Sequence, residues 1–188
     1  MLKFLVVVGS TREGRRGRTI SDWFIEGARR IGGAEWQLAD LADLDLPWYK
    51  AATSPGSGEL DPHASVQRWG DLVRESDGFV WVTPEYNHGY PASLKNAIDH
   101  LYHEWMRKPV SIVSYGGLAG GSRAAEQLRL VACELQMAPI RSGIVIARAG
   151  ALIGPDGKMN ARDLDLAIAH VSEQLIWWGE ALKTARSS

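Results

Sequence analysis

The chain contains a single cysteine, Cys133, among its 188 residues. One cysteine excludes an internal disulfide, which agrees with a reducing compartment. Because Cys133 falls inside a segment with helical periodicity, we expect a buried small side chain rather than a nucleophile. The five histidines lack any spacing with acidic or thiol partners that is typical of a metal site, so no metal is predicted.

Long apolar runs and an excess of one charge are also lacking. No stretch is long enough to span a bilayer, and the apolar run at residues 4–8 is shorter than the core of a signal peptide. The formal net charge is −1, which gives no overall attraction to nucleic acid or to a membrane surface. We therefore expect a cytoplasmic protein with neither of these partners.

Several common catalytic and nucleotide-binding motifs are missing. Gly9 and Gly14 have the separation of a nucleoside-triphosphate loop, but Arg15 and Arg16 stand where Lys and Ser or Thr are required. There is no Gly-x-Gly-x-x-Gly turn for a dinucleotide. The sequence around Ser122 lacks the last glycine of a nucleophile elbow, which disfavours a hydrolase using Ser122 or Cys133.

What the chain does contain is a regular alternation of strand-like and helix-like segments. The length fits one domain, residues 1–188. Apolar runs predict five strands, at residues 2–8, 35–41, 78–83, 110–114 and 140–147. Helical periodicity predicts helices at residues 19–31, around 66–73, 91–101, 123–135 and about 163–183. This pattern predicts an α/β fold: a doubly wound parallel five-stranded sheet of flavodoxin-like order 2-1-3-4-5. A long connection, residues 42–63, is equally compatible with a functional loop and a surface excursion.

Three polar or glycine-rich loops follow the first, third and fourth of these strands, at residues 9–15, 83–89 and 114–121. In an open parallel sheet, ligands bind where strands end and helices begin. Three such loops predict convergence on one anionic, ring-bearing ligand. Our hypothesis is flavin mononucleotide (FMN) and a redox function.

The first loop has the features of a phosphate site. Ser10 and Thr11 supply hydroxyl groups, and the glycines allow the backbone to present its amides at a helix start. We expect Thr19 or Ser21 to cap that helix. Charge-assisted hydrogen bonds are expected from Arg12 and also from Arg15 or Arg18.

The second and third loops suit a planar ring. Tyr86 and Tyr90 offer aromatic faces, and Asn87 carries both a donor and an acceptor. For His88 we expect an exposed loop position without a ligand role. The third loop has four glycines within six residues, which allows its backbone to approach a flat ligand closely, and Tyr115 is placed to stack near it.

These residues resemble the NADPH-dependent FMN reductase family, which includes bacterial chromate, quinone and azo-dye reductases of flavodoxin-like fold. The first and third loops match the family at residues 9–12 and 116–122, and the resemblance covers nearly the whole chain. Its most specific element is Pro84-Glu85-Tyr86-Asn87 followed by Leu94-Lys95-Asn96-Ala97-Ile98-Asp99.

The resemblance implies a position for each part of FMN. The phosphate would lie at the first loop and the following turn, on Ser10, Arg12, Arg15, Arg18, Thr19 and Ile20. The isoalloxazine would lie along Pro84, Glu85, Tyr86 and Asn87, with its pyrimidine side at Ser114, Tyr115, Gly116 and Gly117. Many members have a serine where this chain has Arg15. Either Arg15 replaces the hydroxyl with a charge, or FMN binding is altered.

The resemblance also implies an activity. NADPH or NADH would pass hydride to N5 of FMN, and a quinone, flavin, azo compound or metal ion would then take the electrons, in a ping-pong sequence. No side chain need act as acid, base or nucleophile, and Asn87 is our candidate for tuning the N5 edge. The alternatives are a non-enzymatic FMN electron carrier and a pathway-specific flavoprotein of the same fold.

Self-association is the remaining expectation from the resemblance. Family members are usually homodimers or tetramers that meet through the region of residues 83–105. Lys95 and Asp99 are spaced i, i+4 on one helix face. They either pair within the helix, which stabilises it slightly, or pair across subunits.

Overall fold

Four strands of seven residues form the centre of the fold, and all of them run parallel. They are β1 (Leu2–Val8), β2 (Ala34–Asp40), β3 (Gly78–Pro84) and β4 (Pro109–Tyr115). The structure is a computed structural model that describes residues 1–187. Every residue of β3 and β4 is buried, as their continuous apolar sequences require when helices cover both faces of a sheet. The bounds predicted for β1 from sequence match the structure.

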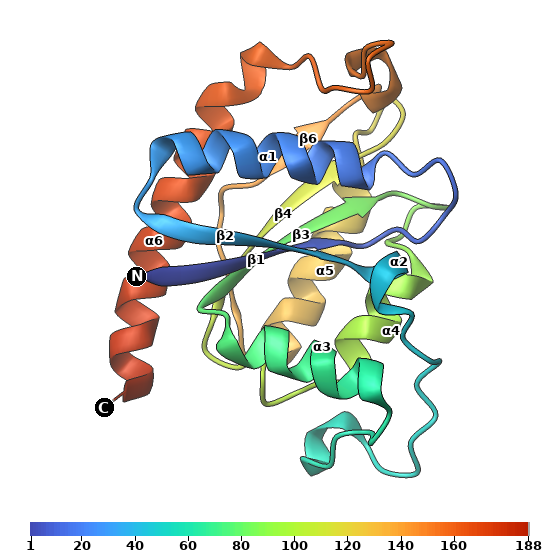
Figure 1. Cartoon of the computed structure of the whole chain (residues 1–188), viewed down its shortest axis with the longest axis vertical. Coiled ribbons are helices and arrows are strands. Elements are labelled where there is room, and N and C mark those ends of the chain that lie inside the picture. Colours follow the sequence, from blue (N-terminus) through green and yellow to red (C-terminus); the bar gives the residue numbers. More distant parts are fainter. Residues whose placement is uncertain (188) are drawn as a thin grey trace.

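The sheet order is β2-β1-β3-β4-β5, as predicted (Figure 1). The prediction of one fifth strand at residues 140–147 was wrong in its bounds. This position in the sheet is occupied by two short segments, β5 (Ala138–Pro139) and β6 (Ile144–Ile146), which both pair with β4. Between them the backbone ladder is interrupted, and here the Ser111 hydroxyl donates to the Ser142 carbonyl at 2.8 Å. Gly143 passes so close that a Cβ there would lie 2.7 Å from the Ile112 carbonyl oxygen.

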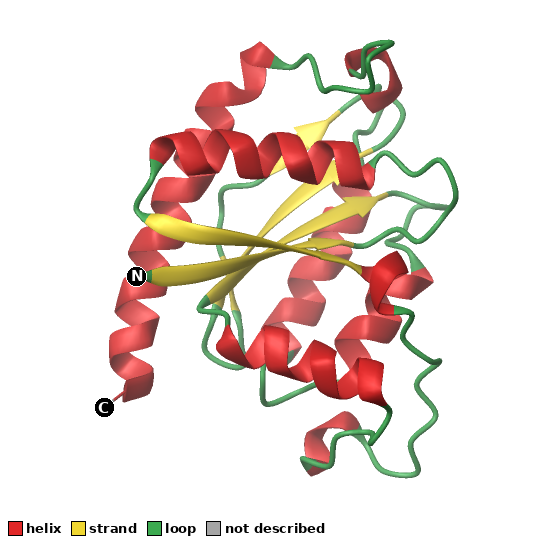
Figure 2. Ribbon diagram, in the orientation of Figure 1, coloured by secondary structure: helices red, strands yellow, loops and turns green. Residues whose placement is uncertain are grey.

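Helices cover the two faces of the sheet, as Figure 2 shows. One face carries α1 (Gly17–Ile31) and α6 (Asp165–Ser187). The other carries α3 (Ala64–Glu75), α4 (Ala92–Asp99) and α5 (Ser122–Glu134). A short helix, α2 (Leu41–Leu44), follows β2 directly and was not predicted. Three single turns of 3₁₀ helix occur at Pro55–Ser57, Ala149–Leu152 and Arg162–Leu164.

Tryptophans fill the core on both sides of the sheet. Trp36 packs between Phe4 and Phe24 under α1, while Trp105 contacts Trp69, Trp81 and Phe79 on the other side. All four of these tryptophans are buried. By contrast, Trp48 and Trp177 are 70% and 62% exposed, so their indoles do not contribute to the core.

Two local predictions were wrong. Helix α1 begins at Gly17 with Arg16 at its N-cap and has no side-chain cap, so neither Thr19 nor Ser21 caps it. Both residues lie inside the helix, since helical backbone extends two residues further than the apolar pattern indicated. Cys133 is exposed rather than buried: it lies on the outer side of α5, whose buried residues include Leu128 and Ala132. Within residues 1–187, no helix has the length and apolar character needed to cross a membrane.

Candidate functional site

The three loops identified from the sequence meet at the carboxyl edge of the sheet. In Figure 2 these loops lie together beyond the arrowheads of the central strands. A cavity of about 200 Å³ lies between them, and each loop contributes three residues to its lining: Arg12, Arg15, Arg16, Pro84, Glu85, Tyr86, Tyr115, Gly116 and Gly117. The order of a doubly wound sheet reverses between β1 and β3, and this is where such a cavity is expected.

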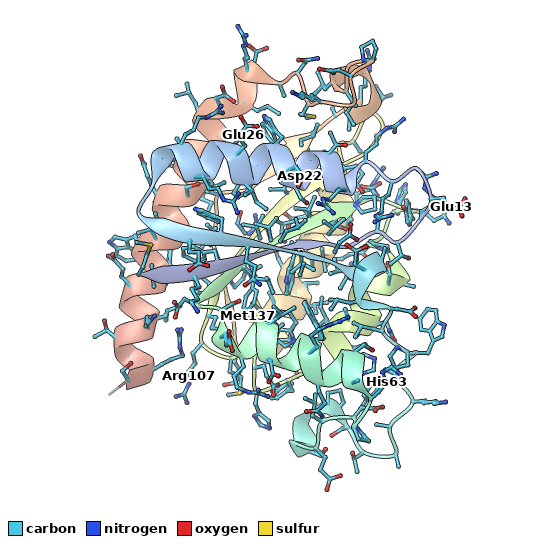
Figure 3. The ribbon with its side chains drawn as sticks, in the orientation of Figure 1. Glu13, Asp22, Glu26, His63, Arg107 and Met137 are labelled. Atoms are coloured by element: carbon cyan, nitrogen blue, oxygen red, sulfur yellow. The ribbon has the colours of Figure 1, made fainter. Side chains whose placement is uncertain are left out.

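The first loop ends at the exposed start of α1. The Arg15 amide donates to the Arg12 carbonyl at 3.1 Å, and Gly14 takes a positive φ of 64° to close this turn. Glu13 extends outward from the tip of the loop (Figure 3). Because no side chain caps α1, its first amides and its positive dipole end are available to an anion.

Arg15 forms an ion pair with a carboxylate of the protein. Its Nη2 lies 2.8 Å from Oδ2 of Asp40, whose side chain is only 1% exposed. The other oxygen of Asp40 accepts the Ala42 amide at 3.1 Å and caps α2. The hydrogen bond to Asp40 raises the pKa of Arg15 above its usual value. Arg15 therefore ties the first loop to α2, and its charge is already balanced.

Two other arginines of this loop have no such partner. Within residues 1–187, neither Arg12 nor Arg16 forms an ion pair, and both are exposed. The Arg16 guanidinium lies against Gly150, where a Cβ would be 2.7 Å from Nη2. Arg18 instead pairs with Asp22 one turn along α1, at 3.1 Å and in solvent. The available positive charge is thus on Arg12 and Arg16, and Arg16 was missed by the sequence analysis.

Ser10 joins the first two loops. Its hydroxyl is fully buried and hydrogen-bonds the Tyr86 hydroxyl at 2.7 Å. Tyr115 lies beside it: burial raises the pKa of this phenol, which keeps it neutral, and its oxygen is 2.9 Å from where a Cβ at Gly17 would lie. The two phenols and Ser10 thereby hold the first loop, the second loop and the end of β4 together.

The second loop forms a tight turn at Tyr86–Gly89. Tyr86 and Gly89 exchange two backbone hydrogen bonds, at 2.9 and 3.0 Å. Asn87 and His88 both have positive φ, 50° and 70°, as in a type I′ turn. The Gln127 side chain donates to the His88 carbonyl at 2.9 Å and anchors the turn to α5. Asn87 and His88 are exposed, and the exposure predicted for His88 is confirmed.

Glu85 points toward α5 rather than toward the solvent. Arg123 Nε donates to Glu85 Oε1 at 2.5 Å, and the Arg123 amide donates to Oε2 at 3.2 Å. The hydrogen bond from Arg123 lowers the pKa of Glu85. The carboxylate is therefore ionised and occupied at the start of α5. A second cavity, of about 480 Å³, opens here between Glu85, Asn87, His88, Gly117, Leu118, Ala119, Gly121 and Arg123.

Glycines allow the third loop to fold back over β4. Gly121 has a φ of 84°, and a Cβ there would lie 2.9 Å from both the Ser114 Cβ and the Tyr115 nitrogen. Beneath it, the buried Ser114 hydroxyl has no hydrogen-bond partner within the described chain. The amides of Arg148 and Ala149 hold the carbonyls of Gly117 and Gly116, at 2.8 and 3.2 Å. This leaves the Gly116–Gly117 backbone fixed at the cavity wall.

The structure brings most of the predicted site residues together, with two exceptions. The Ile20 side chain is buried in the core, and its amide donates to the Arg16 carbonyl. Ile20 thus contributes apolar support beneath the loop. Arg18 lies on the outer surface of α1, where it pairs with Asp22. Thr19 is half-buried in the first turn of the helix.

Comparison with known proteins identifies this arrangement. The sequence profile of the NADPH-dependent FMN reductases matches residues 2–151. The chain belongs to the NADPH-dependent FMN reductase family. An NAD(P)H-dependent FMN reductase of Schizosaccharomyces pombe is 43% identical over 149 residues, which cover 78% of this chain and 74% of that protein. A quinone reductase of Escherichia coli K12 is 32% identical over 136 residues, or 69% of each chain.

A solved structure shares the fold. The structure of a flavoenzyme NAD(P)H:(acceptor) oxidoreductase from Paracoccus denitrificans superimposes with a TM-score of 0.76, covers 96% of this chain and 98% of its own, and is 22% identical. Membership of the FMN reductase family makes this chain a flavin-dependent oxidoreductase, with FMN as its flavin and a reduced nicotinamide as its donor.

The residues present fit this cofactor. A phosphate group needs amides and cations, which the uncapped α1 terminus and the two unpaired arginines supply. A flat ring needs close approach to backbone, and Gly117 has no atom within 4 Å of its Cβ position. The unpartnered Ser114 hydroxyl adds a buried polar group at the same end of β4.

Several supporting residues of this reductase were missed by the sequence analysis. Each binds a loop residue that is distant in the chain. The four pairs are Asp40 with Arg15, Arg123 with Glu85, Gln127 with the His88 carbonyl and Ser93 with the Gly9 carbonyl. For Asp40, the one sequence signal that could have found it is its position as an acidic residue near the end of the predicted second strand. The others lie on ordinary helical surfaces, where composition gives no indication of a partner.

Proposed function

We propose that the whole chain acts as one FMN-binding domain that oxidises NADPH or NADH and reduces a small electron acceptor such as a quinone, a free flavin, an azo compound or a metal ion. The observation that carries this proposal is the cavity where the three loops meet, with an uncapped helix start and two unpaired arginines on one side. The quinone reductase of E. coli and an NADPH azoreductase of a Bacillus species, 31% identical, support the quinone and azo classes of acceptor.

Different loops are assigned to the phosphate and to the ring of FMN. We assign the phosphate to the α1 amides, Arg12 and Arg16, and propose that the buried Ser10 hydroxyl contributes by fixing Tyr86. The ring is assigned to the backbone of residues 84–87 and 114–117, between the two cavities described above. Bound FMN would supply the two-electron redox chemistry that couples oxidation of the nicotinamide to reduction of the acceptor.

We propose that the protein groups at this site orient the flavin and the donor and shield them from water. The Glu85 carboxylate is ionised and bound by Arg123, and burial keeps the Tyr115 phenol neutral. Asn87 is the exposed amide beside the second cavity, and we assign it to hydrogen-bond the N5 edge. Rate enhancement then comes from orientation of donor and flavin.

Anaerobic absorbance spectroscopy tests the function directly. We expect the purified chain to bind FMN stoichiometrically and its flavin band to bleach on addition of NADPH or NADH. The nicotinamide that bleaches the flavin band at the higher rate is the preferred donor. Steady-state rates with a quinone should give parallel double-reciprocal lines, the pattern of a ping-pong reaction. Binding of FMN without bleaching by either nicotinamide would contradict the reductase and favour a simple electron carrier.

We further propose that the chain associates into a homodimer or tetramer through the region of residues 83–105. A groove of about 570 Å³ lies between α4 and α5, and its lining includes Leu101, Tyr102, Leu130 and Val131. Leu130 is 73% exposed there. The Lys95 and Asp99 side chains already pair within α4 at 2.7 Å, so apolar contact rather than this ion pair is expected to join subunits.

Sedimentation equilibrium checks the association. We expect at least twice the mass of one chain, and Leu130→Asp should shift the protein toward monomer because a carboxylate would be buried in the contact. Leu166→Asp, at an 84% exposed position on α6, is the matched control. A monomeric wild-type chain at micromolar concentration would refute the proposal.

A further inference from the structure

A third and larger cavity adjoins the flavin site on the β2 side. Its volume is about 660 Å³, within the range of small-molecule sites. It is lined by Thr11, Arg12, Leu41, Ala42, Asp45, Leu46, Trp48, Tyr86, Pro91, Ala92, Ser93 and Asn96. Arg12 and Tyr86 also line the flavin cavity, so the two spaces meet at these residues. We call this cavity the Trp48 groove.

The loop that carries Trp48 is held on both sides of that residue. The Pro47 carbonyl accepts two hydrogen bonds, from Asn96 Nδ2 at 2.9 Å and from His100 Nε2 at 2.8 Å. The Tyr49 amide donates to Asn96 Oδ1 at 2.8 Å, and the Tyr49 ring packs edge-on against His100. Helix α4 therefore fixes the backbone of residues 47–49 rigidly.

Trp48 itself is nevertheless 70% exposed. A fixed backbone that holds a large indole out in solvent gains no core packing from it. The floor beside it is apolar, with Leu41, Leu46, Pro91 and Ala92 among the lining. An indole above such a floor is a platform on which a planar ring can stack.

The polar groups of the groove indicate what else the occupant carries. Arg12 lines both this groove and the flavin cavity, so its five N–H donors can meet the FMN phosphate on one side and a second phosphate in the groove on the other. Thr11 adds a hydroxyl beside it. These groups suit a phosphate-bearing ligand. The lining also includes the exposed Asp45 carboxylate, an acceptor suited to sugar hydroxyls or an exocyclic amine. A ring, a sugar and phosphates together describe a nucleotide.

From these features we infer that the Trp48 groove binds the adenosine diphosphate end of the nicotinamide donor, with adenine stacked on Trp48 and the diphosphate near Arg12. This rests on the proposed function. The nicotinamide must reach the flavin, and the remainder of the donor must then lie in a space continuous with that site. A quinone or an azo compound has no need of a phosphate-binding wall, which favours the donor as occupant.

The test compares donors with and without adenosine on the FMN-loaded protein. Stacking of a base on an aromatic residue contributes enough that Trp48→Ala should raise the KM for NADPH and NADH roughly tenfold, with kcat nearly unchanged. Reduced nicotinamide mononucleotide, which lacks the adenosine, should react equally well with both proteins. Trp48→Phe should restore most of the affinity, and Trp177→Ala, an exposed tryptophan outside the groove, should match wild type.

A binding measurement tests the groove without relying on enzyme turnover. ADP-ribose should bind the wild-type holoprotein in calorimetry and should bind Trp48→Ala about tenfold more weakly. An increased KM for the quinone instead of the donor, or weakened FMN binding, would overturn the inference and assign the groove to the acceptor or the flavin. Unchanged NADPH kinetics would also overturn it while leaving the reductase intact. A wild-type flavin that NADPH does not bleach would overturn the proposed function itself.

Discussion

Replacing Gly121 with alanine is expected to lower the free energy of unfolding by about 3 kcal/mol and to abolish tight FMN binding. The backbone here has a φ of 84°, which costs an L-residue roughly 1–2 kcal/mol. The added Cβ would also lie 2.9 Å from the Tyr115 nitrogen and 3.0 Å from its carbonyl oxygen. Backbone cannot move aside as a side chain does, so overpacking adds roughly 1–3 kcal/mol. Urea denaturation and flavin titration measure the two effects.

Substitutions at two other glycines separate the cost of backbone strain from the cost of the close contact. Gly58 has nearly the same left-handed backbone as Gly121, with φ 86° and ψ −4° against φ 84° and ψ 13°. The nearest atom to its Cβ position is 3.8 Å away, so Gly58→Ala reports the cost of backbone strain alone. Gly117 has neither a positive φ nor a close neighbour, and Gly117→Ala should leave stability within about 0.5 kcal/mol of wild type. If Gly121→Ala were no less stable than Gly58→Ala, the close contact with β4 would have no energetic consequence.

The arginines of the first loop are expected to separate into two functional classes. The double variant Arg12→Ala, Arg16→Ala should weaken FMN binding about 100-fold, because a hydrogen bond to a charged group contributes roughly 1.5–3 kcal/mol. Riboflavin, which lacks the phosphate, should bind the double variant and wild type alike. The affinity of the wild type for FMN should also fall with ionic strength, and this dependence should be much weaker in the double variant.

Arg15→Ala should behave differently. Its loss leaves the 1% exposed carboxylate of Asp40 without a counter-ion, so the main effect is a loss of about 2 kcal/mol in unfolding free energy. The salt dependence of FMN binding should remain that of wild type. Asp43→Ala, which removes an exposed carboxylate 4.0 Å from Arg18, is the control for a general change of charge near α2. A selective loss of FMN over riboflavin in Arg15→Ala would show that Arg15 binds the phosphate after all.

The sheet could be predicted from the sequence because its signal is local. An apolar run such as residues 78–83 has few ways to be buried other than as a central strand, and the structure places it in β3. The fifth strand was predicted less well, since its interruption is accompanied by contacts with β4 that are distant in the chain, such as the bond from the Ser111 hydroxyl to the Ser142 carbonyl, 31 residues apart. The position of Cys133 was missed for a similar reason: periodicity indicates a helix more reliably than it indicates which side faces the core.

The site was predictable in outline but not in its internal pairing. The three loops follow strands, and the topology of the sheet alone brings them to one edge. Whether Arg15 meets a ligand or Asp40 is decided by the geometry of β2 and α2, which no pattern near Arg15 reveals. The Trp48 groove was not foreseen at all. Its loop is defined by contacts with Asn96 and His100, and these residues are more than 45 positions away.

The type I′ turn at Tyr86–Gly89 has a consequence for the thermodynamics of ligand binding. Two backbone bonds and the Gln127 anchor hold this turn before any ligand arrives. The loss of conformational entropy for these residues is therefore incurred during folding, and the ring of a ligand meets a surface that is already ordered. Residues 11–14 of the first loop are exposed and have less support. Any ordering entropy that opposes binding should thus arise at the phosphate end of the site and be small at the ring.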